Sequence, residues 1–394
     1  MSFATVRRSL FTVHMWIGLI LGLLLAALGL SGSLLVYDEQ IGNLINPPPR
    51  ATTAGQPLPL SMIQDIVGET VGRPGQMQIF LPQKPGEVIS VRVGGISPMG
   101  VRPEAGNQMD RPGMNTEGRR SREGGGEGRG LQLFIDPVSG EVLGTRTALL
   151  PAFLTFAHQL HGNFLLGRDG RSLVVGWLGV AMLLLGLSGL VLWWPKRGQW
   201  KYAFGVRKTA QGLRFHRELH AATGIWIFLV FMAVSFSGVV LAWPQVMGAN
   251  PPGARGVPIV EATDGKRLGA TEAVIAASAA VPGLVPRSVT IPARRDQAIA
   301  VNYLSNGAIA ATVFVDPYRG KVLSVRDSSQ SFMAWMRPVH QGSLGPVWQI
   351  LVFLSGLVPS LFIVTGLIMW STKRKRHVPM TAPLADDVEE EAPA

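Results

Sequence analysis

The sequence contains no cysteine, and this absence alone excludes several classes of protein. Without cysteine there are no disulfides, no cysteine-ligated iron–sulfur clusters, no thiolate zinc sites and no C-x-x-C-H attachment of c-type haem. Any redox centre in this chain must therefore be held by nitrogen, oxygen or thioether ligands.

Charged residues are also scarce, at 15% of 394 residues, whereas hydrophobic residues make up 47%. This composition is more apolar than a soluble domain of the same length requires. A membrane-spanning helix needs about 20 apolar residues. Four windows meet that length: residues 10–36, 172–194, 221–243 and 346–370. The sequence therefore predicts an α-helical membrane protein with four transmembrane helices in a lipid bilayer.

The first window could instead be a signal peptide, because Arg7 and Arg8 precede it. Its apolar run exceeds the roughly 7 to 15 residues usual in such peptides. A related window starting at residue 221 lies in the middle of the chain and cannot serve as a signal. The first window is therefore predicted to remain in the protein as a span.

Lysine and arginine are concentrated in the short segments, which lie before the first window and at residues 195–220 and 371–394. Positive charge in short flanks favours the cytoplasmic side. Both termini are therefore predicted to be cytoplasmic, with the two long loops on the outer side. The net charge of +11 is mainly explained by this orientation, so no nucleic-acid partner is expected.

The second half of the sequence repeats the first. Five residues recur 206 positions later: Arg8, His14, Gly18, Ser31 and Gly32 as Arg214, His220, Gly224, Ser237 and Gly238. After the first and third windows, each half carries an amphipathic helical pattern, at 61–71 and 271–281, with Ser61 and Thr271 as expected N-caps. Strand patterns follow each helix, so the outer loops are predicted to be two α+β modules of an internally duplicated chain.

Each outer module also contains an Asp-Pro-x-x-Gly turn between apolar runs, beginning at Asp136 and Asp316. Asp accepts backbone hydrogen bonds, Pro sets φ and Gly takes the left-handed position, so each turn predicts a β-hairpin. The first copy holds an insertion at residues 94–130 that is rich in glycine and arginine. We expect this insertion to be a flexible linker.

Six of the seven histidines lie near a predicted membrane edge. His14 and His220 occupy matching positions at the inner ends of the first and third spans, and His216 precedes His220 by one helical turn. His161 and His340 lie at the outer ends of the second and fourth spans, with His158 nearby. Ionisable side chains at such positions tend to mark function, although a histidine bonded to water or a carbonyl is the simpler interpretation of any one of them.

Paired imidazoles on facing helices can hold b-type haem without cysteine. Two haems are therefore predicted, one between His14 and His220 and one between His161 and His340, with His216 and His158 as substitute ligands or neighbours. Two such haems would carry electrons through roughly 30 Å of hydrocarbon.

Other assignments for the histidines remain open at this point. His158, His161 and His340 could form a three-histidine zinc or copper site on the outer side, and Glu218 is the main carboxylate near the inner histidines. The hydrolase motifs G-x-S-x-G and H-E-x-x-H do not occur. No catalytic side chain is assigned from the sequence.

Several of these motifs together resemble the PepSY-associated transmembrane family of bacteria. They are His-x-x-x-Gly opening the first span, Asp-Pro-x-x-Gly-x-Val-Leu in both outer modules, Leu160-His161 before the second span, and the run ending in Trp193, Trp194 and Pro195. The resemblance implies an inner-membrane protein with two periplasmic PepSY-like modules. Some members are similar to haem-containing ferric-siderophore reductases, and some are fused to flavodoxin-type reductase domains.

The apolar windows and the repeat give the predicted organisation its boundaries, and the resemblance implies that the outer modules are periplasmic. In chain order the segments are a span at 10–36, a first periplasmic module at 37–150, a pre-helix segment at 151–171, a span at 172–194, a cytoplasmic basic loop at 195–220, a span at 221–243, a second module at 244–330, a pre-helix segment at 331–345, a span at 346–370 and a cytoplasmic tail at 371–394.

The expected function is that of a dihaem oxidoreductase that passes electrons to a periplasmic acceptor, with ferric siderophore as substrate. The tail after Arg376 carries only an acidic run, so the electron donor is expected to be a separate cytoplasmic reductase or quinol. Two alternatives are a haem-free binding or regulatory protein and an accessory factor for uptake of metal chelates.

Overall fold

The computed structural model describes residues 3–72, 75–94, 131–146, 150–243, 257–263, 265–305, 308–327 and 332–376. Of the predicted flexible insertion at 94–130, all but Gly94 lies outside these described residues. The same is true of residues 377–394 in the predicted tail.

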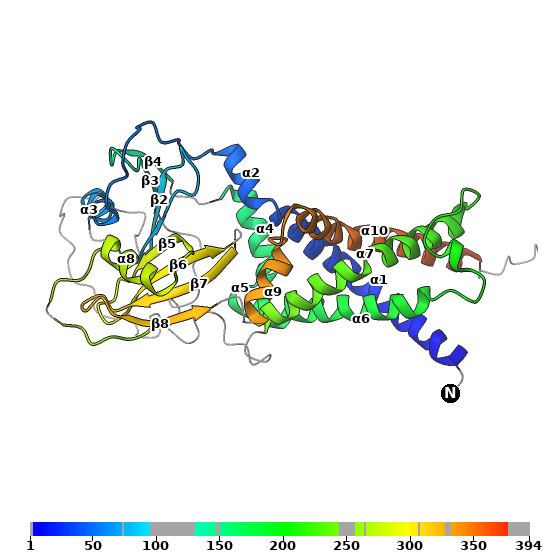
Figure 1. Cartoon of the computed structure of the whole chain (residues 1–394). Coiled ribbons are helices and arrows are strands. Elements are labelled where there is room, and N and C mark those ends of the chain that lie inside the picture. Colours follow the sequence, from blue (N-terminus) through cyan, green and yellow to red (C-terminus); the bar gives the residue numbers. More distant parts are fainter. Residues whose placement is uncertain are drawn as a thin grey trace, which may run out of the picture.

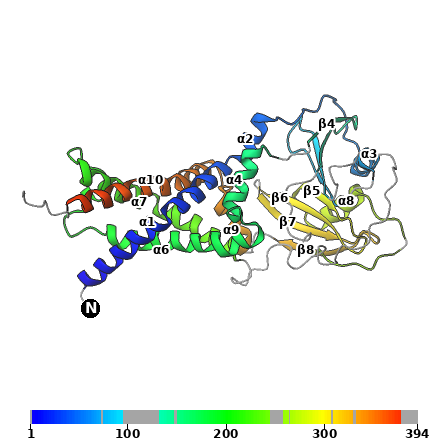
Figure 2. The ribbon, with the colours of Figure 1, turned by 180° about the vertical axis from the view of Figure 1, so that it is seen from behind.

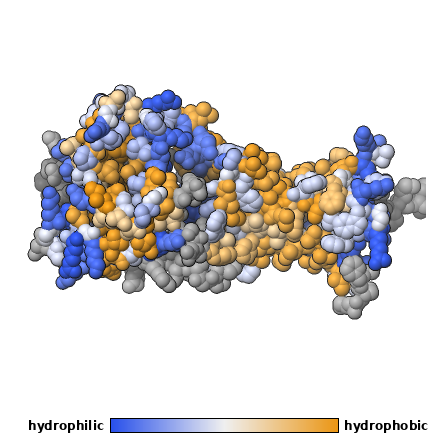
Figure 3. Space-filling model, viewed as in Figure 1, coloured by the Kyte–Doolittle hydropathy of each residue, from blue (hydrophilic) through white to orange (hydrophobic). Residues whose placement is uncertain are grey.

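Four long helices form a bundle at one end of the molecule (Figure 1). They are α1 (Phe3–Leu35), α6 (Gly176–Trp193), α7 (Gly212–Ala242) and α10 (Pro346–Arg376). Each belongs to a helical segment long and apolar enough to cross a membrane, which confirms the four predicted spans. An apolar band covers the bundle between two hydrophilic ends (Figure 3).

The helical boundaries differ from those predicted. Because α7 begins at Gly212, residues 212–220 are helical although the basic loop was predicted to run to residue 220. The charges in this stretch do not interrupt the helix, since arginine and glutamate have good helix propensity and the apolar periodicity resumes immediately afterwards. His216 and His220 therefore lie on the first turns of α7.

Small residues allow α1 and α10 to approach closely. The backbone of Gly29 lies so near that of Gly356 that an added Cβ would collide with its carbonyl oxygen. One turn later, Ser33 donates a hydrogen bond to the Phe353 carbonyl (2.7 Å). Close backbone packing and interhelical hydrogen bonds of this kind stabilise helix pairs in lipid, where the hydrophobic effect contributes little between apolar helices.

A single eight-stranded antiparallel sheet lies at the other end of the molecule (Figures 1 and 2). Its strands are β1 (Met77–Phe80), β2 (Ile89–Val93), β3 (Leu131–Ile135), β4 (Val142–Arg146), β5 (Val285–Ile291), β6 (Ile299–Ser305), β7 (Ala308–Val315) and β8 (Val322–Asp327). The strand order is β4-β3-β2-β1-β5-β6-β7-β8, so β1 and β5 join the two halves. The sequence predicted two modules and did not predict that their strands share one sheet.

Two helices, α3 (Leu60–Val71) and α8 (Ala270–Ala280), cover one face of this sheet. Ile63 and Val67 from α3 and Ala273 and Ala277 from α8 are fully buried in one core with alternate residues of the strands. Period-two burial in the strands and helical spacing in α3 and α8 explain why these residues share a core.

The expected N-caps were wrong. Pro59 precedes α3 and Gly269 precedes α8, and neither caps through a side chain. Thr271 is the second residue of α8, and its hydroxyl accepts the backbone N–H of Ser61 (2.9 Å). A side chain at the start of one helix thus accepts a hydrogen bond from the start of the other. The free N–H groups at a helix N-terminus can donate to a neighbouring side chain as well as to the helix's own cap.

The two Asp-Pro hairpins form as predicted. β3 pairs with β4 and β7 pairs with β8 around them, and Gly140 (φ 77°) and Gly320 (φ 67°) take the left-handed conformation. Asp136 accepts four backbone N–H groups, from the turn and from Thr52 and Thr53, whereas Asp316 accepts two from its own turn.

Short helices connect the sheet to the bundle. They are α2 (Asp38–Ile45), α4 (Ala152–Asn163), α5 (Gly167–Gly170), a π-helical turn at Arg171–Val175 and α9 (Phe332–Gln341). Helix α4 packs on α1, and α9 packs on α7 and α10. We call this end of the bundle the sheet end. The opposite end, where α1 and α7 begin and α10 finishes, is the terminal end (Figures 1 and 2).

Candidate functional site: two histidine pairs

The terminal-end pair consists of His14 on α1 and His220 on α7. Their ring centroids lie 6.4 Å apart and the rings are nearly perpendicular, at 72°. Two imidazoles bound on opposite sides of one metal ion, with bonds of about 2 Å, have centroids roughly 6 Å apart. The spacing therefore suits a shared metal centre. Phe362 stacks on His220, with centroids 4.4 Å apart.

Hydroxyl groups fix the orientation of both terminal-end rings. His14 Nδ1 lies 2.8 Å from Ser188 Oγ on α6, and His220 Nδ1 lies 2.8 Å from Thr365 Oγ1 on α10. Each hydroxyl donates its own hydrogen to a carbonyl one turn earlier on its helix. Since that hydrogen is used, each hydroxyl accepts from the imidazole, so the proton is on Nδ1 and the Nε2 lone pair is available.

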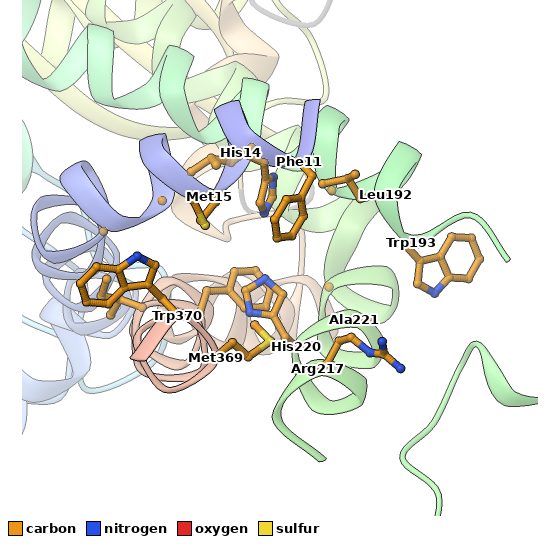
Figure 4. A pocket seen from close by; sticks show the side chains of 18 of the residues that line it. Phe11, His14, Met15, Leu192, Trp193, Arg217, His220, Ala221, Met369 and Trp370 are labelled. Carbon is orange, nitrogen blue, oxygen red and sulfur yellow. The ribbon is translucent and has the colours of Figure 1, made fainter. Parts of the chain in front are cut away.

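Both rings line a cavity of about 1650 Å³ (Figure 4). His14 and His220 project into it from opposite helices, next to Phe11, Met15 and Trp370 (Figure 4). Much of its wall is apolar or glycine. Its lining also contains seven basic residues: Arg7, Arg8, Lys196, Arg214, Arg217, Lys373 and Arg374.

The sheet-end pair consists of His161 on α4 and His340 on α9. The ring centroids lie 5.8 Å apart, and the two Nε2 atoms are 3.5 Å apart. His161 Nδ1 donates to the Leu28 carbonyl of α1 and His340 Nδ1 donates to the Val234 carbonyl of α7, both at 2.9 Å. Leu28 and Val234 are 206 positions apart, as are His14 and His220.

Two facing Nε2 lone pairs are chemically unsatisfied in the sheet-end pair. A carbonyl oxygen can only accept a hydrogen bond, so Nδ1 carries the proton in both rings. Each neutral ring therefore presents its Nε2, an acceptor, to the Nε2 acceptor of the other ring. Burial lowers the pKa of His161, and burial together with the neighbouring His161 lowers the pKa of His340, so the rings stay neutral near pH 7. A positive centre between the Nε2 atoms would satisfy both lone pairs.

Glycine allows the sheet-end rings to approach the spans. A Cβ added at Gly32 would lie 2.7 Å from His161 Cε1, and one added at Gly238 would lie 2.9 Å from His340 Cε1. Both distances are shorter than a carbon–carbon contact at optimal separation, about 3.5–4.0 Å. These two glycines, one residue after Ser31 and Ser237, are therefore required by the position of the histidines.

The structure brings together the four histidines predicted as ligands and separates the two substitutes. His158 Nε2 is bonded to Asp38 (2.9 Å), and His216 is not among the residues that line the cavity. Glu218 binds the Arg207 backbone N–H and Arg214 Nε.

The three-histidine metal site is not formed. Among the described residues, no three His, Cys, Asp or Glu side chains gather at one place. Each pair therefore offers two protein ligands.

The sequence did not predict the residues that orient the rings. From the sequence, no role was assigned to Ser188, Thr365 or Phe362. The sequence does contain a signal for Ser188 and Thr365, because Ser188-Gly189 and Thr365-Gly366 occupy corresponding places in the second and fourth spans. The partners on α1 and α7 are backbone carbonyls, which every residue has. No sequence pattern could therefore have identified them.

The fold and site define a multi-pass membrane protein with a four-helix bundle, an attached eight-stranded sheet and two half-buried histidine pairs. The family model described as PepSY-associated TM region matches residues 11–373, and the chain belongs to this family. The match includes all four paired histidines.

One similar protein is the uncharacterized protein PA4219 of Pseudomonas aeruginosa. It is 28% identical over 259 residues, which represent 55% of this chain and 62% of that protein. The aligned part thus spans less than two thirds of the relative.

Proposed function

We propose that this protein is an internally duplicated dihaem reductase of the bacterial inner membrane, which passes electrons to ferric siderophore in the periplasm. The single observation that carries the proposal is the arrangement of four histidines in two facing pairs, each with Nδ1 hydrogen-bonded to a neighbouring helix. Haem, when bound, supplies one-electron redox chemistry at its iron.

The number of protein ligands favours haem over zinc. Structural zinc is held by four protein ligands, and catalytic zinc usually by three and a water. Haem iron takes four ligands from its macrocycle and needs only axial ligands from the protein. Two imidazoles per site match that need. In each ring the Nδ1–H bond orients the imidazole and raises the basicity of Nε2.

The terminal-end cavity also suits the shape and charge of haem. Its volume of about 1650 Å³ is ample for a planar macrocycle. The apolar and glycine-lined wall suits the ring, and the basic residues in its lining suit the two carboxylates of haem. His14 and His220 would hold haem at the terminal end, and by analogy of the repeat His161 and His340 would hold haem at the sheet end.

The length of α1 and α7 between the two histidine pairs sets the distance between the pairs along the membrane normal. His14 and Leu28 are fourteen positions apart on α1, as are His220 and Val234 on α7, which corresponds to about 21 Å of helix. Since Leu28 and Val234 hold the sheet-end rings, the sites lie near opposite ends of the bundle. Electrons could then cross most of a hydrocarbon core of about 30 Å.

The proposed orientation places the terminal end in the cytoplasm and the sheet in the periplasm. The basic residues around the terminal end support it through the positive-inside rule. The donor would then be a cytoplasmic reductase or quinol, and the two halves of the sheet would correspond to two PepSY-like modules. In this arrangement each haem site needs a histidine from both halves of the chain.

An absorption spectrum of the purified full chain, oxidised and dithionite-reduced, tests the proposal together with extraction and quantification of haem. We expect about two non-covalent b-type haems per chain. Ferric chelate added to the reduced protein should reoxidise it. A protein expressed with adequate haem supply that shows no Soret band contradicts the proposal and favours a haem-free binding or uptake role.

A further inference from the structure

Two short helices at the sheet end, α4 and α9, run across the bundle instead of along it (Figures 1 and 2). The contacts of α9 agree with this direction. His340, in its last turn, donates to the Val234 carbonyl of α7. Phe332, its first residue, has its ring 6.4 Å from that of Phe236. Phe332 and His340 are eight positions apart, about 12 Å of helix, whereas their partners are two positions apart, about 3 Å. Helix α9 therefore crosses α7.

Both short helices reach the depth of the last turns of the spans. Val234 lies eight positions before the end of α7, and Leu28 lies seven positions before the end of α1. Both residues belong to helical segments long and apolar enough to cross a membrane. Because His340 and His161 bond to these two carbonyls, the histidine ends of α9 and α4 lie about 10–12 Å inside the ends of the spans.

Each short helix exposes a pair of aromatic side chains. The pairs are Phe153 with Phe156 on α4 and Phe332 with Trp335 on α9, and each of these side chains is between 46% and 55% exposed. A spacing of three positions puts the two members of a pair on one helix face. The pairs match at an offset of 179 positions, the offset that also relates the two sheet-end histidines. The repeat therefore places the same exposed aromatic face in both halves of the chain.

These aromatic faces continue the surface of the spans. The ring of Phe332 contacts Phe236, which is itself exposed on α7 within a candidate membrane span. Exposed apolar patches mark surfaces that another molecule covers, and a patch joined to a membrane-spanning surface is covered by the same lipid. The composition of α4 agrees, since it contains no Asp, Glu, Lys or Arg.

Tryptophans on the spans place the membrane edge at the same level. Trp177 and Trp243 lie at the sheet end, with ring centroids 5.3 Å apart. Trp194 follows Trp177 by 17 positions and Trp243 follows Trp226 by 17, which corresponds to about 26 Å of helix. Tryptophan is enriched at both edges of a hydrocarbon core that is about 30 Å thick. One of these edges therefore lies near Trp177 and Trp243, at the sheet end of the bundle.

We infer that α4 and α9 are interfacial helices, whose aromatic pairs insert between the lipid headgroups and the adjoining acyl chains of the leaflet on the sheet side. A helix that lies in the membrane plane with aromatic side chains on its lipid face has this arrangement. The segments predicted to be periplasmic then lie in the membrane surface, and the histidine pair that they carry lies at the depth of the headgroups. The inference goes beyond the proposed function and needs neither haem nor a substrate.

The absence of cysteine from the chain allows a direct test, because one introduced cysteine is a unique labelling site. Full-length Phe156→Cys and Trp335→Cys variants are labelled with bimane and reconstituted in vesicles of phosphatidylethanolamine and phosphatidylglycerol. We expect lipids spin-labelled near the headgroup end of the acyl chain to lower the fluorescence at both sites by about twofold or more. Iodide present on both sides of the membrane should lower it much less.

Two exposed positions provide matched controls. Ile275→Cys on α8, which covers the sheet, should respond to iodide and not to the spin-labelled lipids. Leu229→Cys, midway along α7, should respond best to lipids labelled deep in the acyl chain. Phe153→Cys provides a second site on α4 if the first variant there does not fold.

The outcomes separate lipid from the other possible occupants of the aromatic faces. Quenching by iodide as strong as that of the α8 control would place these faces in water and overturn the inference. Protection from both quenchers would show that a second copy of the chain covers them, and would also overturn it. Lipid quenching at both helices supports the inference whether or not the chain holds haem.

Discussion

The two histidine pairs differ mainly in what holds each ring. At the terminal end, side-chain hydroxyls on α6 and α10 accept the Nδ1 protons, and both rings line a cavity of about 1650 Å³. At the sheet end, backbone carbonyls on α1 and α7 accept the protons, and Ser237 Oγ also lies 3.3 Å from His340 Nδ1. The terminal-end rings therefore depend on hydroxyls that a substitution can remove, whereas the sheet-end rings depend mainly on backbone position.

This difference also changes which residues are indispensable. A carbonyl cannot be deleted by substitution, so the sheet-end geometry depends on the close approach that Gly32 and Gly238 permit. At the terminal end the corresponding spans are less crowded, and a Cβ at Gly189 would meet His14 at an ordinary 3.5 Å.

Removal of a ligand should have the largest effect and should separate the pairs. His14→Ala or His220→Ala is expected to remove the terminal-end haem and keep the other, and His161→Ala or His340→Ala should do the opposite, so haem per chain falls from about two to about one. Haem extraction with protein quantification measures this ratio. His158→Ala is the control and should keep both haems. Loss of both haems from every single variant would show that the sites are not independent.

Crowding of the sheet-end rings should have the next largest effect. Gly32→Ala and Gly238→Ala place a methyl group 2.7 Å and 2.9 Å from the imidazoles, so each ring must move and the sheet-end haem should be lost or bound in an altered geometry. Low-temperature electron paramagnetic resonance of the oxidised protein reports the axial ligands of each site. Gly366→Ala is the matched control, because nothing lies within 4 Å of its Cβ position. An unchanged sheet-end signal in both variants would contradict the geometry described above.

Deletion of a hydroxyl at the terminal end should have a smaller effect. Thr365→Val and Ser188→Ala remove the acceptor of an Nδ1 proton but leave the ligand, so haem should be retained about tenfold less tightly or at a shifted midpoint potential. Potentiometric titration of the Soret region measures the shift. Thr365→Ser keeps the hydroxyl and should restore the original potential. An equal shift of the sheet-end haem would indicate that the substitution acts through general packing.

The smallest effect is expected at the two Asp-Pro hairpins, where the halves of the sheet also differ. Burial raises the pKa of Asp136, but four backbone N–H donors outweigh it and hold that pKa well below its usual range. A carboxyl with a depressed folded-state pKa stabilises the fold above its unfolded pKa of about 4, and the contribution is lost as pH falls further.

Asp136→Asn should therefore lower the thermal midpoint of the full chain at pH 7, and the difference from the unsubstituted protein should shrink below about pH 4. Asp316→Asn removes a carboxylate with two donors and should cost about half as much. Thermal unfolding followed by tryptophan fluorescence at several pH values measures both. Equal losses in the two variants would show that the additional N–H donors from Thr52 and Thr53 do not contribute.

The elements that followed from local pattern were predictable. The four spans, the helices α3 and α8 and the two Asp-Pro hairpins each depend on the spacing of apolar residues or on turn chemistry within a few residues. Strand β1 was missed because it has only four residues, and β5 was missed because it contains proline, arginine and polar residues. Their pairing joins segments about 200 positions apart. Such non-local pairing leaves no signal in a sequence window.

The pairing of His14 with His220 was predictable because the two residues match at the 206-residue offset of the repeat. The structure places their rings next to each other. The choice between the primary histidines and their substitutes was not fixed by spacing, since His216 and His220 lie on one face of α7.

The β1–β5 junction has a consequence for how the protein is made. Val285 follows Phe80 by 205 positions, and two membrane spans separate them. At a synthesis rate of about 5–20 residues per second, β1 waits roughly 10–40 s for its partner. During that time the edge of β1 that faces away from β2 is unpaired and can pair with other chains. The half-built sheet is therefore the stage of biogenesis at which a holding chaperone on that side of the membrane would matter most.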